Sequence, residues 1–122
     1  MAEIAKTMDK SAQPLDPGGW VIVAWQNMAN GDTGEVVELV QFADRSVQVA
    51  GTFGSGGTCV IQGSNDGVNF NTINDATDAP LSFLTGGLKT IMDVPRYIRP
   101  AVTAGDGTTS LTATMLFRRQ VK

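Results

Sequence analysis

The side chains that could do chemistry in this chain are few, and most of them are carboxylates. The sequence has 12 Asp and Glu residues, one cysteine (Cys59) and no histidine. Without histidine there is no imidazole base, no Cys–His nucleophile pair and no His-containing metal site. Pairs of carboxylates can run acid/base chemistry, but a chain with 12 of them brings some together by chance. We therefore expect no enzyme activity, no cofactor and no small-molecule substrate.

Carboxylate and amide oxygens, which are ligands that calcium prefers, gather in one short stretch. They belong to Asn65, Asp66, Asn69, Asn71, Asn74, Asp75 and Asp78. Their order does not follow the calcium-loop pattern, because Gly67 comes too early and no glutamate closes the loop. Asn65-Asp66-Gly67 is instead typical of a tight hairpin turn. We expect turn chemistry here and no metal site.

Cys59 lies between Thr58 and Val60 in an alternating run of apolar and polar residues. A cysteine in such a strand is usually a small core residue rather than a nucleophile. We expect it to be buried and dispensable for function. Glycine-rich residues 54–57 lack the following Lys-Ser/Thr and the helix that a phosphate-binding loop requires.

The elements that must position these residues are β-strands from residue 20 onward. Runs rich in β-branched or alternating residues predict strands at 20–28, 36–42, 46–53, 58–64, 68–74, 80–84, 88–94, 96–103 and 108–120. Pro95 and Pro100 indicate that the run between them is an edge strand or carries a bulge. The pattern predicts an all-β, antiparallel β-sandwich with jelly-roll-like topology. An immunoglobulin-like core would need a second cysteine.

Residues 1–19 differ from the rest, so we divide the chain into an N-terminal arm (1–19) and a β-sandwich domain (20–122). Ile4, Met8 and Leu15 give the arm some apolar character, but Pro14 and Pro17 end any helix. We expect an extended arm that is ordered only where it lies on another surface. The arm shows no export signal, and no run approaches a membrane span, so we expect synthesis in a reducing cytoplasm and no membrane partner.

Charge is distributed unevenly along the chain. Residues 1–44 carry two lysines and seven carboxylates, whereas residues 94–122 carry five basic side chains and only Asp106. The basic residues Arg96, Arg99, Arg118 and Arg119 have too few aromatic neighbours for a nucleic-acid surface, so we expect no nucleic-acid partner. The acidic front and basic end can attract each other within one chain or between copies.

Trp20 and Trp25 differ in parity, so a regular strand points them to opposite faces. One of the two is then a core residue. The other is covered by a second layer or is exposed as an interface anchor. The interface candidates from the sequence are thus Ile4, Met8, Leu15, Trp20, Trp25, Arg96, Arg99, Arg118 and Arg119.

Four stretches (47–53, 58–70, 95–103 and 110–119) resemble the capsid decoration, or cement, proteins of tailed bacteriophages. The resemblance implies a structural β-sandwich that sits as a homotrimer on the outer surface of a mature head, with the major capsid protein as its partner. The runs GSNDGVNF at 63–70 and RYIR at 96–99 are also similar to discoidin-type jelly-roll modules, which bind glycans or surfaces. A phage tail or baseplate component is a third alternative.

Overall fold

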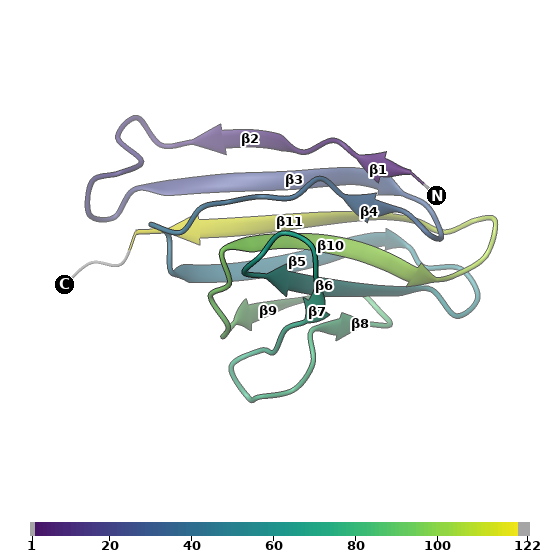
Figure 1. Ribbon diagram of the computed structural model, residues 1–122. Coiled ribbons are helices and arrows are strands. Elements are labelled where there is room, and N and C mark those ends of the chain that lie inside the picture. The colour runs from purple at the N-terminus through teal and green to yellow at the C-terminus, as the bar shows by residue number, and fades with distance from the viewer. Residues whose placement is uncertain (1, 120–122) are drawn as a thin grey trace.

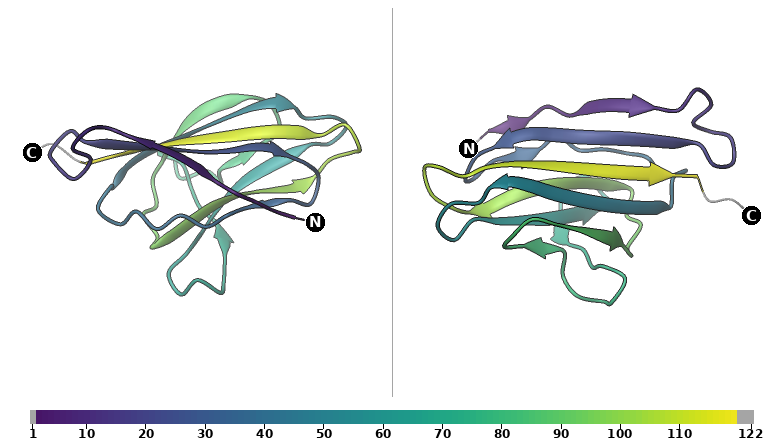
Figure 2. Two further views of the ribbon diagram at one scale, coloured as in Figure 1. Left: turned by 90° about the horizontal axis from the view of Figure 1, so that it is seen from above. Right: turned by 180° about the vertical axis from the view of Figure 1, so that it is seen from behind.

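The structure is a computed structural model that describes residues 2–119. Gln120, the last residue of the predicted strand 108–120, and Lys122 of the basic end lie outside the described residues. The described chain contains 11 strands and no helix, arranged as two sheets that face each other (Figures 1 and 2). Between residues 2 and 119, accordingly, no helix has the length and apolar character needed to cross a membrane.

Each sheet has its own strand order. The six-stranded sheet runs β1 (Glu3–Ile4), β4 (Thr33–Gly34), β10 (Tyr97–Ala104), β6 (Thr58–Ser64) and β7 (Asn71–Thr72), with β8 (Ser82–Phe83) also paired to β6. The five-stranded sheet runs β2 (Thr7–Lys10), β3 (Trp20–Met28), β11 (Ser110–Arg118), β5 (Asp44–Thr52) and β9 (Gly87–Ile91). All pairings are antiparallel except that of β1 with β4.

The connections make this sandwich a jelly roll. From β3 to β6 and again from β8 to β11, each strand lies in the opposite sheet from the one before it. The result is β3-β11-β5-β9 in one sheet, facing β4-β10-β6-β7 in the other. Two interlocked Greek keys of this kind define jelly-roll topology. The predicted all-β, jelly-roll-like sandwich is therefore confirmed.

The core lies between the sheets and is built from alternate residues of the long strands. β3 contributes Val21, Val23 and Trp25, and β11 contributes Leu111, Ala113, Met115 and Phe117. Val47 and Val49 of β5, Cys59 and Ile61 of β6, and Ile98 and Val102 of β10 complete its centre. This spacing of two follows from the pleat, which sends successive side chains to opposite faces.

The predicted strand at 36–42 is wrong. In this segment only Val37 pairs, with Ile98 of β10, and the chain then turns where the Phe42 N–H donates to the Leu39 carbonyl. The cause is Arg45, whose guanidinium donates to the carbonyl oxygens of Phe42 at 2.7 Å and Leu39 at 3.0 Å. These two bonds hold the segment as a turn, although its apolar residues have strand propensity.

The predicted tight hairpin at Asn65-Asp66-Gly67 is also wrong in its details. β6 and β7 do form a hairpin, but Gly63 pairs with Asn71, so residues 64–70 form a long loop and the return strand is short. The Asp66 carboxylate accepts hydrogen bonds from several loop residues, and a loop wound around one side chain replaces the two-residue turn.

β10 is not an edge strand, because it lies between β4 and β6. Its pairing with β6 is regular from Tyr97 to Val102 and shifts only between Val102 and Ala104, so the run between the two prolines carries no bulge in that pairing either. The N–H groups of Ile98 and Val102 donate to the Val37 and Asp32 carbonyls, and Pro100 sits between these two bonds. The missing donor of Pro100 thus falls where pairing with β4 is already interrupted.

The arm lies on its own sandwich (Figure 1). β1 adds a parallel strand to β4, and β2 adds an antiparallel strand to the free edge of β3. Every side chain of β2 is exposed, whereas Ile4 of β1 is partly buried against the core. The arm therefore crosses from one sheet to the other and covers one edge of each.

Candidate docking face and loop pocket

The outward side of the five-stranded sheet presents rows of uncharged side chains. The strand registers place Ile22, Leu116, Ser46 and Thr90 side by side in one row and Ala24, Thr114, Gln48 and Leu88 in the next. We call the outward side chains of β3, β11, β5 and β9 the open face, and the right-hand view of Figure 2 looks onto it. Among the described residues, charges occur only at its margins, on Asp9 of β2 and on the Arg118–Asp44 pair.

The two tryptophans lie on opposite sides of β3, as their parity predicted. Trp25 is fully buried in the core, and its indole N–H donates to the Glu35 carbonyl at 2.9 Å. This corrects its place among the interface candidates, because a residue sealed between two sheets cannot contact a partner. Trp20 is half-buried on the open face, directly opposite Arg118 of β11.

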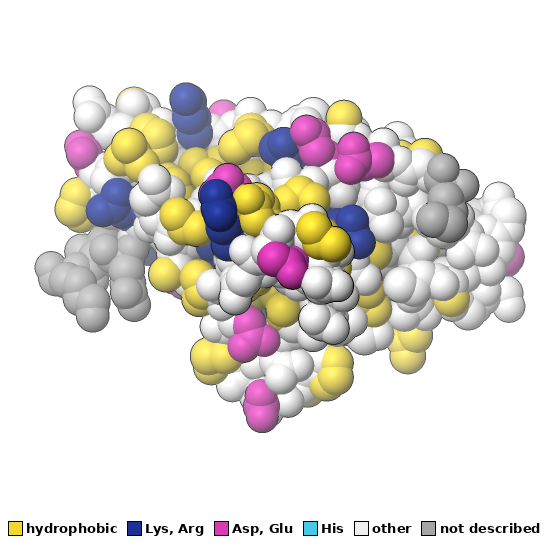
Figure 3. Space-filling model, in the orientation of Figure 1, with side chains coloured by type: hydrophobic (Ala, Val, Ile, Leu, Met, Phe, Trp, Pro, Cys, Tyr) yellow, Lys and Arg dark blue, Asp and Glu magenta, His cyan; other side chains and the backbone are white. Residues whose placement is uncertain are grey.

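The outward side of the six-stranded sheet is different, because the chain covers part of it. Residues 64–70 fold back over β10, and a Cβ built on Gly67 would come within 3.3 Å of the Tyr97 ring. The Arg99 guanidinium lies 3.9 Å from the centroid of the Phe70 ring and donates to Gln62. We call this side the covered face. Figure 3 shows charged side chains of both signs on it.

The acidic front and the basic end meet within one chain. Arg96, which also stacks on Tyr97, pairs with Glu38 at 2.7 Å, and Arg118 lies 3.7 Å from Asp44. The backbone N–H of Arg119 donates to the Gly19 carbonyl. At least two of the four arginines that the sequence singled out, Arg96 and Arg118, are therefore attracted to acidic residues of the same chain.

Of the arm candidates, Met8 and Leu15 remain available to a partner. Met8 is 52% exposed and Leu15 58% exposed, whereas Ile4 is partly buried. Met8 also borders a shallow hollow of about 370 Å³ between β2 and residues 36–39. Lys6 forms an ion pair with Glu35 at 3.0 Å on the rim of that hollow and helps to hold the arm in place.

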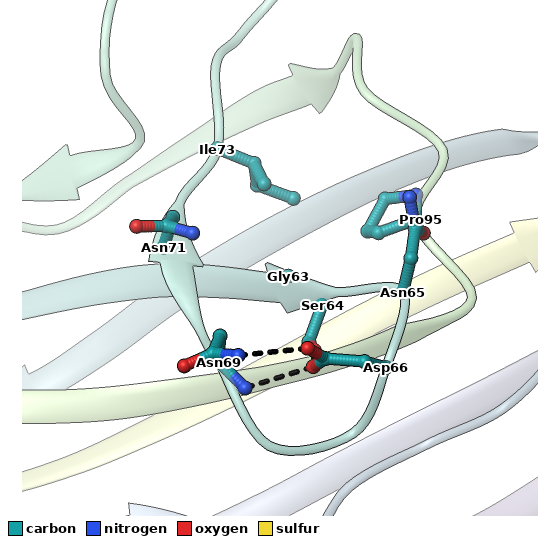
Figure 4. A pocket seen from close by; sticks show the side chains of 8 residues that line it. All are labelled: Gly63, Ser64, Asn65, Asp66, Asn69, Asn71, Ile73 and Pro95. Atoms are coloured by element: carbon teal, nitrogen blue, oxygen red, sulfur yellow. Dashed lines mark hydrogen bonds between the residues drawn. The ribbon is translucent and has the colours of Figure 1, made fainter.

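A second and larger hollow, of about 430 Å³, lies beside the β6–β7 loop (Figure 4). We call it the loop pocket; it is lined by Gly63, Ser64, Asn65, Asp66, Asn69, Asn71, Ile73 and Pro95. Asp66 holds the loop in shape: one oxygen accepts from the Ser64 hydroxyl and from the backbone N–H groups of Val68 and Asn69, all at 2.8 Å. The other oxygen accepts from the Asn69 side chain.

The carboxylates that raised the question of calcium are occupied by turn hydrogen bonds. The bonds from Asn69, Val68 and Ser64 lower the pKa of Asp66 well below its ordinary range. Asp75 accepts from the hydroxyl and N–H of Thr77 and from the Ala79 N–H, and these bonds lower its pKa as well. Residues 2–119 contain no group of three or more Asp, Glu, Cys or His side chains arranged to hold a metal ion.

Cys59 and Arg45 are buried side chains whose pKa values are shifted by burial. Cys59 is fully buried, as predicted, and burial raises the pKa of its thiol to about 12. Arg45, which sequence reasoning missed, is 2% exposed, and burial lowers its pKa to about 10, so it stays charged at neutral pH. Parity could have found it, because Arg45 points to the same side of β5 as Val47 and Val49.

The fold has counterparts among solved structures, whereas no family model and no curated protein matches the chain. The prophage-derived protein YomS of SPBc2 is 12% identical with a TM-score of 0.59, over 91% of this chain and 94% of that one. The K2 adhesin domain of Lys-gingipain is 12% identical (TM-score 0.45, 93% and 82% covered). A family 89 glycoside hydrolase from Clostridium perfringens is 16% identical (TM-score 0.41), and the match covers 94% of this chain but 11% of the hydrolase. At these identities the likeness concerns the fold alone.

Proposed function

We propose that this protein is a non-catalytic structural component of a phage virion, which decorates and stabilises the capsid by docking its open face on the outer surface of the head. The observation that carries the proposal is the open face itself. The inner rows of this sheet surface, with Ile22, Leu116 and Leu88 among hydroxyl and amide groups, can be covered by a partner without burying a charge.

The overall likeness to YomS supports a phage origin. It extends over nearly the whole of both chains, and YomS is a prophage-derived protein. The sequence resemblance to decoration proteins over residues 46–119 points to the same class of virus. Capsid decoration, with the major capsid protein as partner, is the specific role that we propose within that class.

A homotrimer is the proposed oligomer. One sandwich has a small docking surface, and coupling three of them multiplies weak contacts through effective concentration. Because Arg96 and Arg118 are already paired within the chain, we assign contacts between copies to the exposed apolar residues of the arm side, Met8 and Leu15, rather than to the charge asymmetry.

Sedimentation with capsids tests this function directly. Purified protein is mixed with undecorated, expanded heads and with unexpanded procapsids, and the pellets are compared after centrifugation. We expect saturable binding to expanded heads at a fixed number of copies per particle. Protein that stays in the supernatant with both particles would refute capsid decoration, and binding to isolated tails instead would assign it to the tail. Sedimentation equilibrium of the free protein tests the trimer separately.

A further inference from the structure

We propose that the loop pocket binds a neutral ligand rich in hydroxyl groups, of the size of one carbohydrate ring. Its volume of about 430 Å³ lies in the lower part of the range of small-molecule sites. The proposal rests on the pocket alone and does not depend on capsid docking.

The floor of the pocket is apolar and closely packed. A Cβ built on Gly63 would lie 2.4 Å from Pro95 Cγ and 2.9 Å from Ile73 Cγ2, so these three residues leave no gap below the pocket. Figure 4 shows the side chains of Ile73 and Pro95 pointing toward each other beside Gly63. Such a floor suits the C–H face of a sugar ring, which buries apolar area when it lies on aliphatic groups.

The rim offers both donors and acceptors that the fold does not use. Asn71 lines the pocket and is exposed, and no hydrogen bond among the described residues engages its side chain, so its carbonyl oxygen and NH₂ group are both available. Asn65 accepts from the Arg96 N–H through its oxygen, which leaves its NH₂ group available. Asn69 donates to Asp66 and keeps its oxygen. Hydroxyl groups, which donate and accept at once, match this mixture.

The charges around the pocket argue against anionic ligands. Asp66 remains ionised and repels phosphate or carboxylate groups. The nearest arginine in sequence to the pocket wall, Arg96, is engaged with Glu38 and Tyr97 and offers no free cation. A purely apolar ligand would leave the asparagine amides unpaired, which costs free energy. The loop is already fixed by Asp66, so little ordering is needed on binding.

NMR titration of the ¹⁵N-labelled full chain tests the proposal. The probes are glucose, galactose, mannose, N-acetylglucosamine and rhamnose, each added alone, with inorganic phosphate and choline as charged comparisons. We expect at least one sugar to shift the amides of residues 63–73 and of Arg96, whose N–H donates to Asn65, in a saturable way. Asn71→Ala should weaken that affinity about fivefold, the loss of one hydrogen bond. Asn65→Asp, which keeps the oxygen that accepts from Arg96, should also weaken it.

Gln48→Ala on the open face is the matched control, and it should leave the titration unchanged. The amide spectrum of each variant reports whether it is folded, so a loss of affinity can be separated from a loss of structure. Three results would overturn the proposal: no sugar shifts these amides, phosphate or choline shifts them instead, or both asparagine variants bind as tightly as the original chain.

Discussion

The open face and the covered face belong to one sandwich, yet the chain treats them differently. On the six-stranded sheet, residues 64–70 leave β6 and fold back over β10. There Gly67 lies against the Tyr97 ring, and the Phe70 ring packs on the Arg99 guanidinium. On the five-stranded sheet no comparable loop, among the described residues, lies over the rows of Ile22, Leu116 and Ser46. Part of one side is thus covered by the chain itself, and the other side is the one to which we assign docking in the proposed function.

The composition of the two faces supports this division. Threonine and β-branched residues favour a pleated sheet surface without requiring burial, so the open face can exist uncovered. The covered face carries Arg96, Arg99 and Glu38, whose heads stay in contact with water while their stems and planes pack on aromatic rings. Charged groups of this kind would have to be desolvated if a capsid covered them.

The largest effect is expected from the residue that ties the covered side to the rest of the fold. Arg45→Met removes the donors to the Leu39, Phe42 and Pro95 carbonyls and leaves them unpaired in a buried site. We expect a loss of about 3–5 kcal/mol in the free energy of unfolding. Urea denaturation measures it. Hydrogen exchange should rise first in residues 36–45 and 95–99, and uniform loosening of both sheets would contradict this assignment.

A matched pair of charge insertions compares the two faces next. Thr114→Arg puts a cation in the middle of the open face, and Thr72→Arg puts the same cation on the outward side of β7. Burying an unpaired charge opposes docking, so we expect Thr114→Arg to weaken binding to heads about 100-fold and Thr72→Arg to leave it nearly unchanged. Cosedimentation measures both affinities. Equal losses of affinity in the two variants would contradict docking through the open face. A larger loss of affinity for Thr72→Arg would assign docking to the covered face instead.

Sequence reasoning recovered the features that depend on alternation. Strand 20–28, the burial of Cys59 and the opposite orientations of Trp20 and Trp25 all follow from a period of two. It failed where a single polar side chain organises a backbone segment. Arg45 turned 36–42 away from a strand, and Asp66 converted the expected tight turn into a loop and thereby created the loop pocket. Alternation can place Arg45 on the inner side of β5, but it does not predict which backbone groups Arg45 or Asp66 bonds, although most of these groups lie only two to six residues away in the sequence.

Cys59→Ser tests the inner side of the six-stranded sheet with a smaller expected effect. The hydroxyl replaces a fully buried thiol, so we expect a loss of about 1–3 kcal/mol in the free energy of unfolding, with docking and oligomerisation retained. Because burial raises the pKa of the thiol to about 12, the native protein should react slowly with a bulky disulfide reagent. Rapid labelling without denaturant, or failure of the variant to bind heads, would contradict the structural role.

The smallest expected effect is the dependence of the fold's stability on pH. Hydrogen bonds from Thr108 and Ser55 lower the pKa of Asp106 from 3.8 to about 2, and similar bonds lower that of Asp66. A carboxylate with a lowered folded-state pKa stabilises the fold above its unfolded pKa, and that contribution disappears as the pH falls through the folded value. Stability should therefore decline between about pH 4 and pH 2.

Urea denaturation across this range should show a shallower decline for Asp106→Asn, because the variant has no proton to take up there. Asp16→Asn, in the loop before β3, is the control, since no hydrogen bond among the described residues reaches its carboxylate. The inner rows of the open face contain no titratable group, so docking to heads should stay constant between about pH 5 and pH 9. A strong pH dependence of docking in that interval would contradict contact through these uncharged rows alone, because it requires a titrating group in the interface.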